Sequence, residues 1–313
     1  MKAIEIKSFG SPDHLQSASV PLPVIKSDEV LILVKSVSIN PVDTKIRQGV
    51  KLVGRAPDPL PLILGWDLSG IITGVGNAVK DFKTGDEVFA MINYPGLGQA
   101  YAEFVAAKAD QLAIKPAGIS FEDAAAATLS ALTAWQALTV NQHIEKGSKV
   151  LIHAASGGVG HFAVQMAKYL GAYVIATSSA ANRDFVLSLG ADEHIDYQSQ
   201  SLEKVTGNLD FILDPLGGKN TKISLELIKD GGTGVSIVFG FTPELMEKAR
   251  QRKVNAFNIQ VKPNGVQMNI IADLLRNGHI RSHVTNKFSI DQMPEAHTLL
   301  ESGRSTGKIV LNF

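Results

Sequence analysis

The sequence contains no cysteine among its 313 residues, and this absence excludes disulfides, thiolate–zinc sites and cysteine nucleophiles. It also lacks an excess of charge of one sign, because 30 Lys and Arg balance 30 Asp and Glu and no basic run occurs. Affinity for nucleic acid comes largely from neutralising phosphates. We therefore do not expect nucleic acid to be a partner.

Long apolar runs are missing as well. No run approaches the roughly 20 residues that a membrane helix needs, and the opening "MKAIEIKSFG" has no apolar core of a signal peptide. We therefore expect no membrane partner and, with no cysteines to oxidise, a cytoplasmic location. Hydrophobic residues make up 45% of the chain and charged residues 19%, which is the composition of a globular protein with room for two domains.

The first third of the chain has the pattern of a β domain. "KAIEIKSF" and "EVLILVKSVSI" are rich in strand-forming residues, and the second has apolar residues at alternate positions. Gly and Pro recur between such segments, for example in "GRAPDPLPLILG" and "KTGDEV". Many short strands separated by turns indicate a barrel-like β domain.

The pattern changes at "SFEDAAAATLSALTAWQAL", which predicts a helical segment with Ser120 as N-cap and Asp123 three residues later. Strand-like and helix-like segments then alternate as far as "GTGVSIVFG", which is typical of a parallel α/β sheet. The final segments, ending in "GKIVLNF", are strand-like again and would return to the β domain. We therefore expect a β domain made of 1–123 and 263–313, with an α/β domain, 124–262, inserted into it.

A glycine-rich stretch, "ASGGVG", follows the predicted strand Lys149–Ala154 and begins a helix. A dinucleotide fold needs small residues for a tight turn, for the approach of the pyrophosphate and for close packing of helix on strand. Ala155, Gly157 and Gly160 occupy these three positions, with alanine replacing the first glycine. Because strand, turn and helix occur in the required order, the stretch predicts a dinucleotide site with an anion at the helix N-terminus.

The acidic residue that would hold a ribose is absent after the next strand, which ends in "ATSSAANR". An acid there binds the ribose hydroxyls of NAD and repels a 2′-phosphate. The chain instead offers Thr177, Ser178 and Ser179 as neutral donors and Arg183 as a guanidinium that matches phosphate geometry. This favours NADP(H) over NAD(H), the alternative for Arg183 being a solvated helix residue.

Several motifs together resemble those of one family. They are "SINPVDTKIRQG", "LPLILGWDLSGIITGVGNAVKDFKTGDEVFA", "AASGGVG" and "GKIVL". On them the chain resembles, over nearly its whole length, the zinc-free quinone oxidoreductase (zeta-crystallin-like) branch of the medium-chain dehydrogenase/reductase superfamily. The resemblance implies an α/β fold class: a GroES-like β-barrel catalytic domain plus a doubly wound parallel-sheet Rossmann domain, with the active site between them and NADPH as cofactor.

The resemblance also implies site residues. The residues lining the pyrophosphate would be Ser156, Gly157, Gly158, Val159 and Gly160. Those at the adenosine end would be Ser178 and Arg183, which would take the 2′-phosphate, and Tyr197. Those on the nicotinamide side would be Thr133, Phe239 and Gly240, with Asn40 beside the reactive ring.

No metal is expected. Zinc-dependent relatives place a cysteine before the region of Asn40 and Gly-His-Glu where this chain reads "GWD", so that Trp66 stands in place of a histidine ligand. The thiolate and imidazole ligands that zinc prefers cannot be assembled at these positions. We expect His153, at the end of a strand, to be structural or a cofactor neighbour and not a metal ligand.

A site without zinc suits acceptors that spread negative charge, namely conjugated enones, enals and quinones. Lys45 is the candidate that would stabilise an enolate oxygen and donate a proton. The quinone reductases tend to carry Tyr at this position, whereas the alkenal and enone reductases carry Lys, and this chain resembles the latter; the alternative is a surface lysine. Asp43, the third candidate catalytic residue with Lys45 and Asn40, would either orient Lys45 or cap the following turn.

The function predicted from these residues is therefore an NADPH-dependent, zinc-independent reductase of quinones or α,β-unsaturated carbonyls. Its partner would be a small electrophilic substrate, in a pocket to which Ile46, Trp66 and Tyr94 contribute. The alternatives are a ketone/alcohol oxidoreductase and a non-catalytic NADPH sensor. Dimers are common in the family, and "FGFTPELMEKARQRKVNAFNIQV" lies where a homodimer edge could form, but its polar character does not decide between monomer and dimer.

Overall fold

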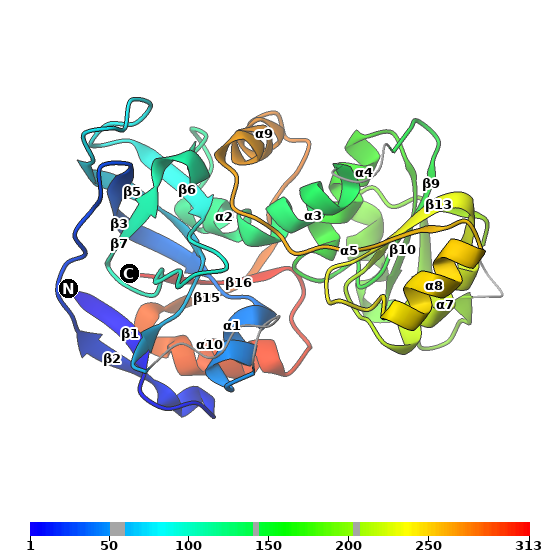
Figure 1. The fold of residues 1–313 in the computed structure, drawn as a ribbon, viewed down its shortest axis with the longest axis horizontal. Coiled ribbons are helices and arrows are strands. Elements are labelled where there is room, and N and C mark those ends of the chain that lie inside the picture. The colour runs from blue at the N-terminus through cyan, green and yellow to red at the C-terminus, as the bar shows by residue number, and fades with distance from the viewer. Residues whose placement is uncertain (51–59, 140–143, 203–206) are drawn as a thin grey trace. The chain divides into compact units, whose positions relative to one another are not determined.

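The computed structural model describes residues 1–50, 60–139, 144–202 and 207–313. The chain divides into two compact units, the first made of Met1–Leu132 and Lys262–Phe313 and the second of Thr133–Val261 (Figure 1). The first boundary between the units, after Leu132, lies within the helix α3 (Leu129–Thr139). It falls later in the sequence than the predicted boundary between residues 123 and 124. The second unit is an insertion in the sequence of the first.

The first unit is built mainly of antiparallel strands. Its strands are β1 (Lys2–Ile6), β2 (Leu15–Ser19), β3 (Glu29–Ser38), β4 (Leu62–Ile63), β5 (Asp67–Val75), β6 (Glu87–Met91), β7 (Phe104–Lys108), β8 (Ala113–Ile114), β15 (Val284–Ser289) and β16 (Lys308–Asn312). Its helices are α1 (Pro41–Arg47), α2 (Phe121–Ala126), α9 (Gly265–Arg276) and α10 (Met293–Glu301). The short 3-10 turns are η1 (Pro12–His14), η2 (Ala109–Gln111) and η4 (Ile290–Gln292).

The strand β3 is the centre of this unit. It pairs along one edge with β5, and along the other with β7 and then with β16. Its apolar residues Val30, Ile32 and Val34 are all buried, as the alternating pattern predicts for a strand with one face in a core. Because β16 comes from the end of the chain, the return of the last segments to the β domain is confirmed.

The second unit is a parallel sheet with helices. Its strands are β9 (Lys149–Ile152), β10 (Tyr173–Ser178), β11 (Glu193–Asp196), β12 (Leu209–Asp214), β13 (Ile228–Ser236) and β14 (Asn255–Asn258). Its helices are α4 (Gly160–Tyr169), α5 (Arg183–Ser188), α7 (Lys219–Leu227) and α8 (Pro243–Gln251), with the 3-10 turn η3 (Ala180–Asn182). In Figure 1, α7 and α8 lie beside this sheet.

The strand order is β11-β10-β9-β12-β13-β14, and all neighbouring pairs are parallel. The chain runs outward from β9 to β11 and then returns to β12 on the other side of β9. This is the doubly wound order, and ligands of such sheets bind at the carboxyl ends of the strands where the order reverses. The predicted Rossmann sheet is confirmed, and the point of reversal lies between β9 and β12.

The helical segment that begins at Phe121 departs from the prediction of one continuous pattern. Ser120 caps α2 as predicted, since its hydroxyl accepts the N–H of Asp123. The helix then stops at Ala126, and α3 begins at Leu129. The Thr128 hydroxyl bonds to the Ala125 carbonyl, and the Leu129 N–H donates to the Asp67 carboxylate at 2.8 Å. The tertiary bond to Asp67 satisfies the Leu129 N–H, which would otherwise bond within a continuous helix.

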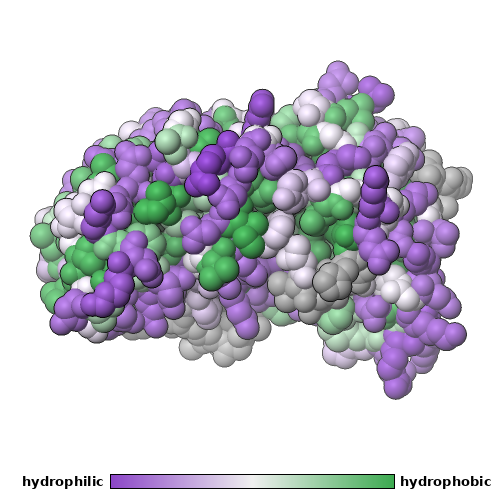
Figure 2. All heavy atoms as spheres, turned by 90° about the horizontal axis from the view of Figure 1, so that it is seen from above, coloured by the Kyte–Doolittle hydropathy of each residue, from purple (hydrophilic) through white to green (hydrophobic). Residues whose placement is uncertain are grey.

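On the face drawn in Figure 2, hydrophilic side chains separate small groups of hydrophobic ones. Within the described residues, no helix combines the length and the apolar character required to cross a membrane. Exposed apolar side chains of the second unit include Leu216, Val238 and Phe239, which follow strand ends. The three side chains belong to the loops after β12 and β13.

Candidate active site

The glycine-rich turn joins β9 to α4. Ala154 has a φ of 47°, a left-handed conformation that few residues other than glycine adopt, so it is Ala154 and not Ala155 that makes the tight turn. The Ala155 N–H donates to the Thr177 carbonyl at 2.9 Å, which fixes the turn against β10. A Cβ atom on Gly160 would lie 2.1 Å from the Ala154 carbonyl oxygen. Only glycine fits there, as the close packing of helix on strand requires.

This turn supplies what a pyrophosphate needs. The ten-residue helix α4 begins at Gly160, and the first N–H groups of a helix have no carbonyl partner within it. Together with the helix dipole they attract an anion. The Ser156 hydroxyl is held at 3.1 Å by the side-chain amide of Asn182, so the turn is also fixed from the η3 side. Asn182 was not predicted from the sequence, because nothing in the local pattern shows which turn its amide contacts.

The end of β10 carries the predicted phosphate residues. Ser178 is buried, and its hydroxyl lies 2.8 Å from His194 Nε2 on the neighbouring strand β11. Arg183 begins α5 with its side chain 60% exposed, and its ion pair is with the adjacent, almost fully exposed Asp184 at 3.3 Å. Tyr197 is also exposed, and its N–H donates to the Ser178 carbonyl at 3.4 Å. A hydroxyl and an accessible guanidinium thus lie where an acid would bind the ribose of NAD.

His153 is a structural residue of this unit. Its ring lies between the hydroxyls of Thr177, at 3.2 Å, and Ser224, at 2.9 Å, and so connects β9 with β10 and α7. Burial lowers the pKa of His153 to about 4, against the opposing effect of Asp214. A neutral ring with both nitrogens engaged is not available to a substrate.

The loop that follows β13 holds the residues predicted for the nicotinamide side. Phe239 has a φ of 58° and is 44% exposed. The Gly240 N–H donates to the Ser236 hydroxyl at 2.9 Å, and a Cβ on Gly240 would lie 2.3 Å from Thr221 Oγ1. The side-chain amide of Asn258 bonds to both the N–H and the carbonyl of Phe241. The loop is therefore held in a strained form, which is the kind of backbone found at ligand sites.

The loop after β12 adds apolar surface at the same end of the sheet. The Asp214 carboxylate accepts the N–H groups of Leu216 and Gly217, which leaves the Leu216 side chain exposed. A Cβ on Gly217 would lie 3.2 Å from Val238, so the two loops are in contact. Thr133, the remaining residue predicted for the nicotinamide side, is buried on α3.

In the first unit, Asn40 lies in a buried polar cluster with Asp67, Ser38 and Lys308. Its Nδ2 donates to the Asp67 carboxylate at 2.7 Å, and its Oδ1 accepts from the Lys308 ammonium. Ser38 donates to the same Asp67 oxygen at 2.6 Å. Both ends of the Asn40 amide are therefore used, and the cluster fixes its orientation.

Asp43 caps the helix α1 and does not orient Lys45. Its carboxylate accepts the Asn40 N–H at 2.6 Å, and its own N–H donates to the Asn40 carbonyl at 2.9 Å. Lys45 lies two residues further along the helix and is exposed, whereas Asp43 is fully buried. Residues two apart on a helix do not face each other.

The Asp43 carboxyl is in an unusual environment. Burial raises its pKa to about 7; the neighbouring Asp67 raises it further, while the Asn40 N–H and Lys308 act in the opposite direction. Its Oδ1 has no hydrogen bond among the described residues. The hydroxyl of Tyr101 is the group that interacts with Asp43 from the other side, without reaching hydrogen-bond geometry.

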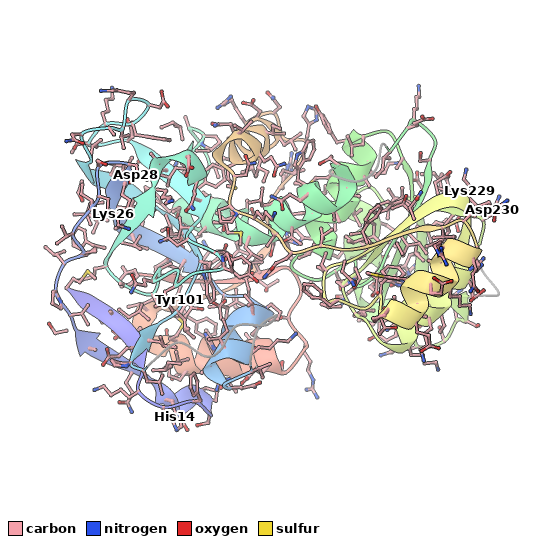
Figure 3. The ribbon with its side chains drawn as sticks, in the orientation of Figure 1. His14, Lys26, Asp28, Tyr101, Lys229 and Asp230 are labelled. Carbon is pink, nitrogen blue, oxygen red and sulfur yellow. The ribbon has the colours of Figure 1, made fainter. Side chains whose placement is uncertain are left out.

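Tyr101, labelled in Figure 3, is buried in the first unit, and its hydroxyl continues this polar cluster. It lies 3.3 Å from His297 Nε2, and Arg47 Nε donates to His297 Nδ1 at 3.4 Å. Burial and the nearby Arg47 lower the pKa of His297 to about 3. Because Arg47 can only donate, the proton of the neutral ring is on Nε2, and the Tyr101 oxygen accepts it. The Tyr101 proton is then free to point toward Asp43.

Comparison with known proteins agrees with this arrangement. Residues 26–117 match the family described as alcohol dehydrogenase GroES-like domain, and residues 189–311 match zinc-binding dehydrogenase. The chain is similar to 2-methylene-furan-3-one reductase of Solanum lycopersicum (33% identity, 100% of this chain, 79% of that protein). It is also similar to the chloroplastic NADPH-dependent alkenal/one oxidoreductase of Arabidopsis thaliana (33%, 99% of this chain, 79% of that protein). The chain belongs to the medium-chain dehydrogenase/reductase superfamily.

A solved structure supports the same membership. The quinone oxidoreductase of Escherichia coli complexed with NADPH has a TM-score of 0.89 and 29% identity, with all of both chains covered. This medium-chain dehydrogenase/reductase therefore has the GroES-like and Rossmann units that the resemblance implied.

The zinc in one family description has no counterpart among the side chains found here. Trp66 is buried, and its indole N–H donates to the Gly96 carbonyl at 2.8 Å. Its ring meets that of Tyr94 edge-on at 5.7 Å, so two of the predicted pocket residues are in contact. In the part of the chain that the structure describes, no group of three His, Asp or Glu could hold a metal ion. With no cysteine in the sequence, a thiolate site cannot be formed anywhere in the chain.

Proposed function

We propose that this protein is an NADPH-dependent, zinc-independent oxidoreductase that transfers a hydride to an α,β-unsaturated carbonyl or a quinone. The observation that carries the proposal is a dinucleotide turn and a following strand that ends in Ser178 and not in an acid, with Arg183 at the start of the next α-helix. Relatives named as an alkenal/one oxidoreductase and a methylene-furanone reductase, and a quinone oxidoreductase complexed with NADPH, support this reaction class.

The residues of the second unit would bind and orient the cofactor. NADPH, when bound, supplies the hydride. The turn Ser156–Gly160 and the N-terminus of α4 would offer N–H groups to the pyrophosphate, apart from that of Gly157, which donates to the Ala154 carbonyl at 2.9 Å. The fixed loop at Phe239 and Gly240 offers apolar contacts and strained backbone on the nicotinamide side. These contacts would exclude water and hold the reacting carbon in one position.

The chain's own chemical task is to manage charge and a proton. Hydride addition to the β-carbon of an enone forms a new C–H bond and shifts the C=C electrons to the carbonyl oxygen as an enolate. A proton must then reach the α-carbon, or in a quinone the oxygens, to complete the product. We assign the charge stabilisation to the exposed ammonium of Lys45 on α1. Asp43 and the Asn40 cluster position that helix and are not themselves proton donors to the substrate.

Replacement of Lys45 tests this role. Lys45→Ala should lower kcat/KM for an enone about 100-fold, which is the range of a positioned acid, while Lys45→Arg should retain the charge effect and lose any proton donation. Lys80 is another exposed lysine of the first unit, and Lys80→Ala is the matched control. Full turnover by Lys45→Ala would show that Lys45 is a surface residue.

The cofactor preference tests Arg183. A hydrogen bond between ionised groups contributes about 1.5–3 kcal/mol, so Arg183→Ala should weaken NADPH binding about tenfold or more and leave NADH binding unchanged. The exposed Arg250 on α8 gives a matched control, Arg250→Ala. Fluorescence titration of both nucleotides measures the ratio of dissociation constants. An unchanged ratio would refute the phosphate assignment.

The substrate class is tested by NADPH oxidation with an alkyl enone, a para-quinone and a saturated ketone side by side. Deuterium transferred from labelled NADPH to the β-carbon of the enone would establish conjugate reduction. Faster quinone turnover would make Lys45 optional. Turnover of the ketone alone would contradict the proposal, and tight NADPH binding without any turnover would favour a sensor.

The oligomeric state and the cellular location are also proposals. The strand β14 is an edge of the six-stranded sheet, and we infer a homodimer formed through that edge, which sedimentation equilibrium would measure. The predicted cytoplasmic location stays a prediction, since one relative is named as chloroplastic; cell fractionation tests it.

A further inference from the structure

His194 lies beside the residues assigned to the 2′-phosphate, and no sequence pattern marks it as part of that site. It is on β11, directly opposite Ala176 of β10. Its Nε2 is 2.8 Å from the hydroxyl of Ser178, the last residue of β10. The residue His194 is half-buried.

Three charged or polar groups face His194 from the surrounding elements. Ser178 comes from β10, Arg183 from the start of α5, and Asp196 from β11 itself. Burial and Arg183 lower the pKa of His194, and Asp196 raises it by less. The Asp196 carboxylate is already bonded by the Ser199 hydroxyl at 2.6 Å and by a backbone N–H. The ring is therefore neutral near pH 7 when no anion is present.

We propose that His194 is a specificity-determining residue for NADPH, which takes up a proton when the 2′-phosphate binds and thereby makes the preference for NADPH over NADH depend on pH. A 2′-phosphate carries a charge of about −1.5 to −2 at neutral pH. Placed between Arg183 and Ser178, the phosphate would outweigh the repulsion between the Arg183 guanidinium and a protonated His194 ring. The inference rests on the proposed function, because it assumes that NADPH binds at this end of β10.

The proton balance fixes the direction of the effect. A histidine whose pKa is higher in the complex than in the free protein binds a proton on association. NADPH affinity is therefore enhanced below the pKa of the complex and is lost as pH rises through it. The maximum loss is about tenfold for each unit by which the phosphate raises the pKa of His194. NADH carries no 2′-phosphate, so its affinity should not follow this curve.

The test compares wild type with His194→Gln, which keeps a side chain able to bond Ser178 but cannot be charged. Dissociation constants for NADPH and NADH are measured between pH 6 and 8.5, and calorimetry in buffers of different ionisation enthalpy measures proton uptake. We expect the NADPH preference of wild type to fall several-fold as pH rises, and that of His194→Gln to be weaker and nearly flat. His279→Gln, an exposed histidine of the first unit, is the matched control.

Separate outcomes distinguish this inference from the proposed function. If wild type prefers NADPH and Arg183→Ala abolishes the preference, but His194→Gln changes neither the preference nor the proton uptake, the His194 inference is wrong and the proposed function stands. If wild type shows no preference for NADPH at any pH, the cofactor assignment itself is wrong. A chemical shift of His194 that titrates identically with and without NADPH would also overturn the inference.

Discussion

The buried carboxyl of Asp43 gives a prediction that can be worked through quantitatively. The side chain is fully buried, and its pKa is raised from 3.8 to about 7, chiefly because burial disfavours the charged form. Asp43→Asn replaces this group by an amide of the same shape, which can still accept the Asn40 N–H. The variant therefore removes a titration from the core with little change in packing.

The direction in which stability changes with pH follows from the protons that the folded and unfolded states bind. Between pH 3.8 and 7 the folded state holds a proton on Asp43 that the unfolded state has released, so the contribution of this group to stability is complete below pH 3.8 and is lost as pH rises through 7. The difference between 3.8 and about 7, at 1.36 kcal/mol per pKa unit, amounts to about 4 kcal/mol. The free energy of unfolding of Asp43→Asn should increase by about this amount relative to wild type between pH 4 and pH 8.

The assay is denaturant unfolding of both proteins across that pH range. The chain has two tryptophans, and a Trp135→Phe background leaves Trp66 to report on the first unit alone. His153 and His297 have lowered pKa values and titrate with the opposite sign, but they are present in both proteins and cancel in the difference. Asp13→Asn, at an exposed position, is the matched control.

The outcome that refutes this reasoning is a constant stability difference between Asp43→Asn and wild type over the whole range. Such a result would mean that Asp43 has an ordinary pKa, and that Lys308 and the Asn40 N–H outweigh its burial. A stability difference between Asp43→Asn and wild type that decreases as pH rises would mean that the fold stabilises the charged form of Asp43. Asp43 would then form an ion pair within the Asn40 cluster.

Three further predictions concern single positions. Gly160→Ala should abolish NADPH binding measured by titration, because the added Cβ would lie 2.1 Å from the Ala154 carbonyl oxygen. Asn258→Ala should raise the KM for NADPH while the melting temperature changes little, since it releases both backbone groups of Phe241. A lower melting temperature with an unchanged KM would refute a role in shaping the loop. Ser120→Ala should reduce the free energy of unfolding by about 1 kcal/mol, the usual value for an N-cap, and denaturant titration would detect it.

The features that the sequence predicted are those set by local pattern. The alternation of strands and helices, the cap at Ser120 and the glycine turn before Gly160 each depend on neighbouring residues, and the structure has them all. The interruption at Thr128 was not predictable, because it depends on a bond from Leu129 to Asp67. Propensity favours helix through that segment, and tertiary contacts override it.

The polar network around Asp43 was hidden for a related reason. Tyr101 and His297 are separated by 196 residues and Arg47 and His297 by 250, so no spacing rule connects them. The same holds for His194, which reaches Ser178 only because β10 and β11 are neighbours in the sheet. Lys45 was identified because a resemblance marks its position, and Arg183 because it follows a strand that lacks the acid of NAD-binding folds. Their chemical roles stay predictions.

The pairing of β16 with β3 has a consequence for synthesis on the ribosome. The strand β16 and its Lys308, which lies among the buried Asp67 and Asp43, are translated after the whole of the second unit. Until they arrive, the first unit has an open strand edge and two buried carboxyls without their ammonium partner. The second unit is a continuous segment, Thr133–Val261, whose strands are all present earlier. The second unit should therefore fold during translation, while the first unit is completed only after the second has been translated.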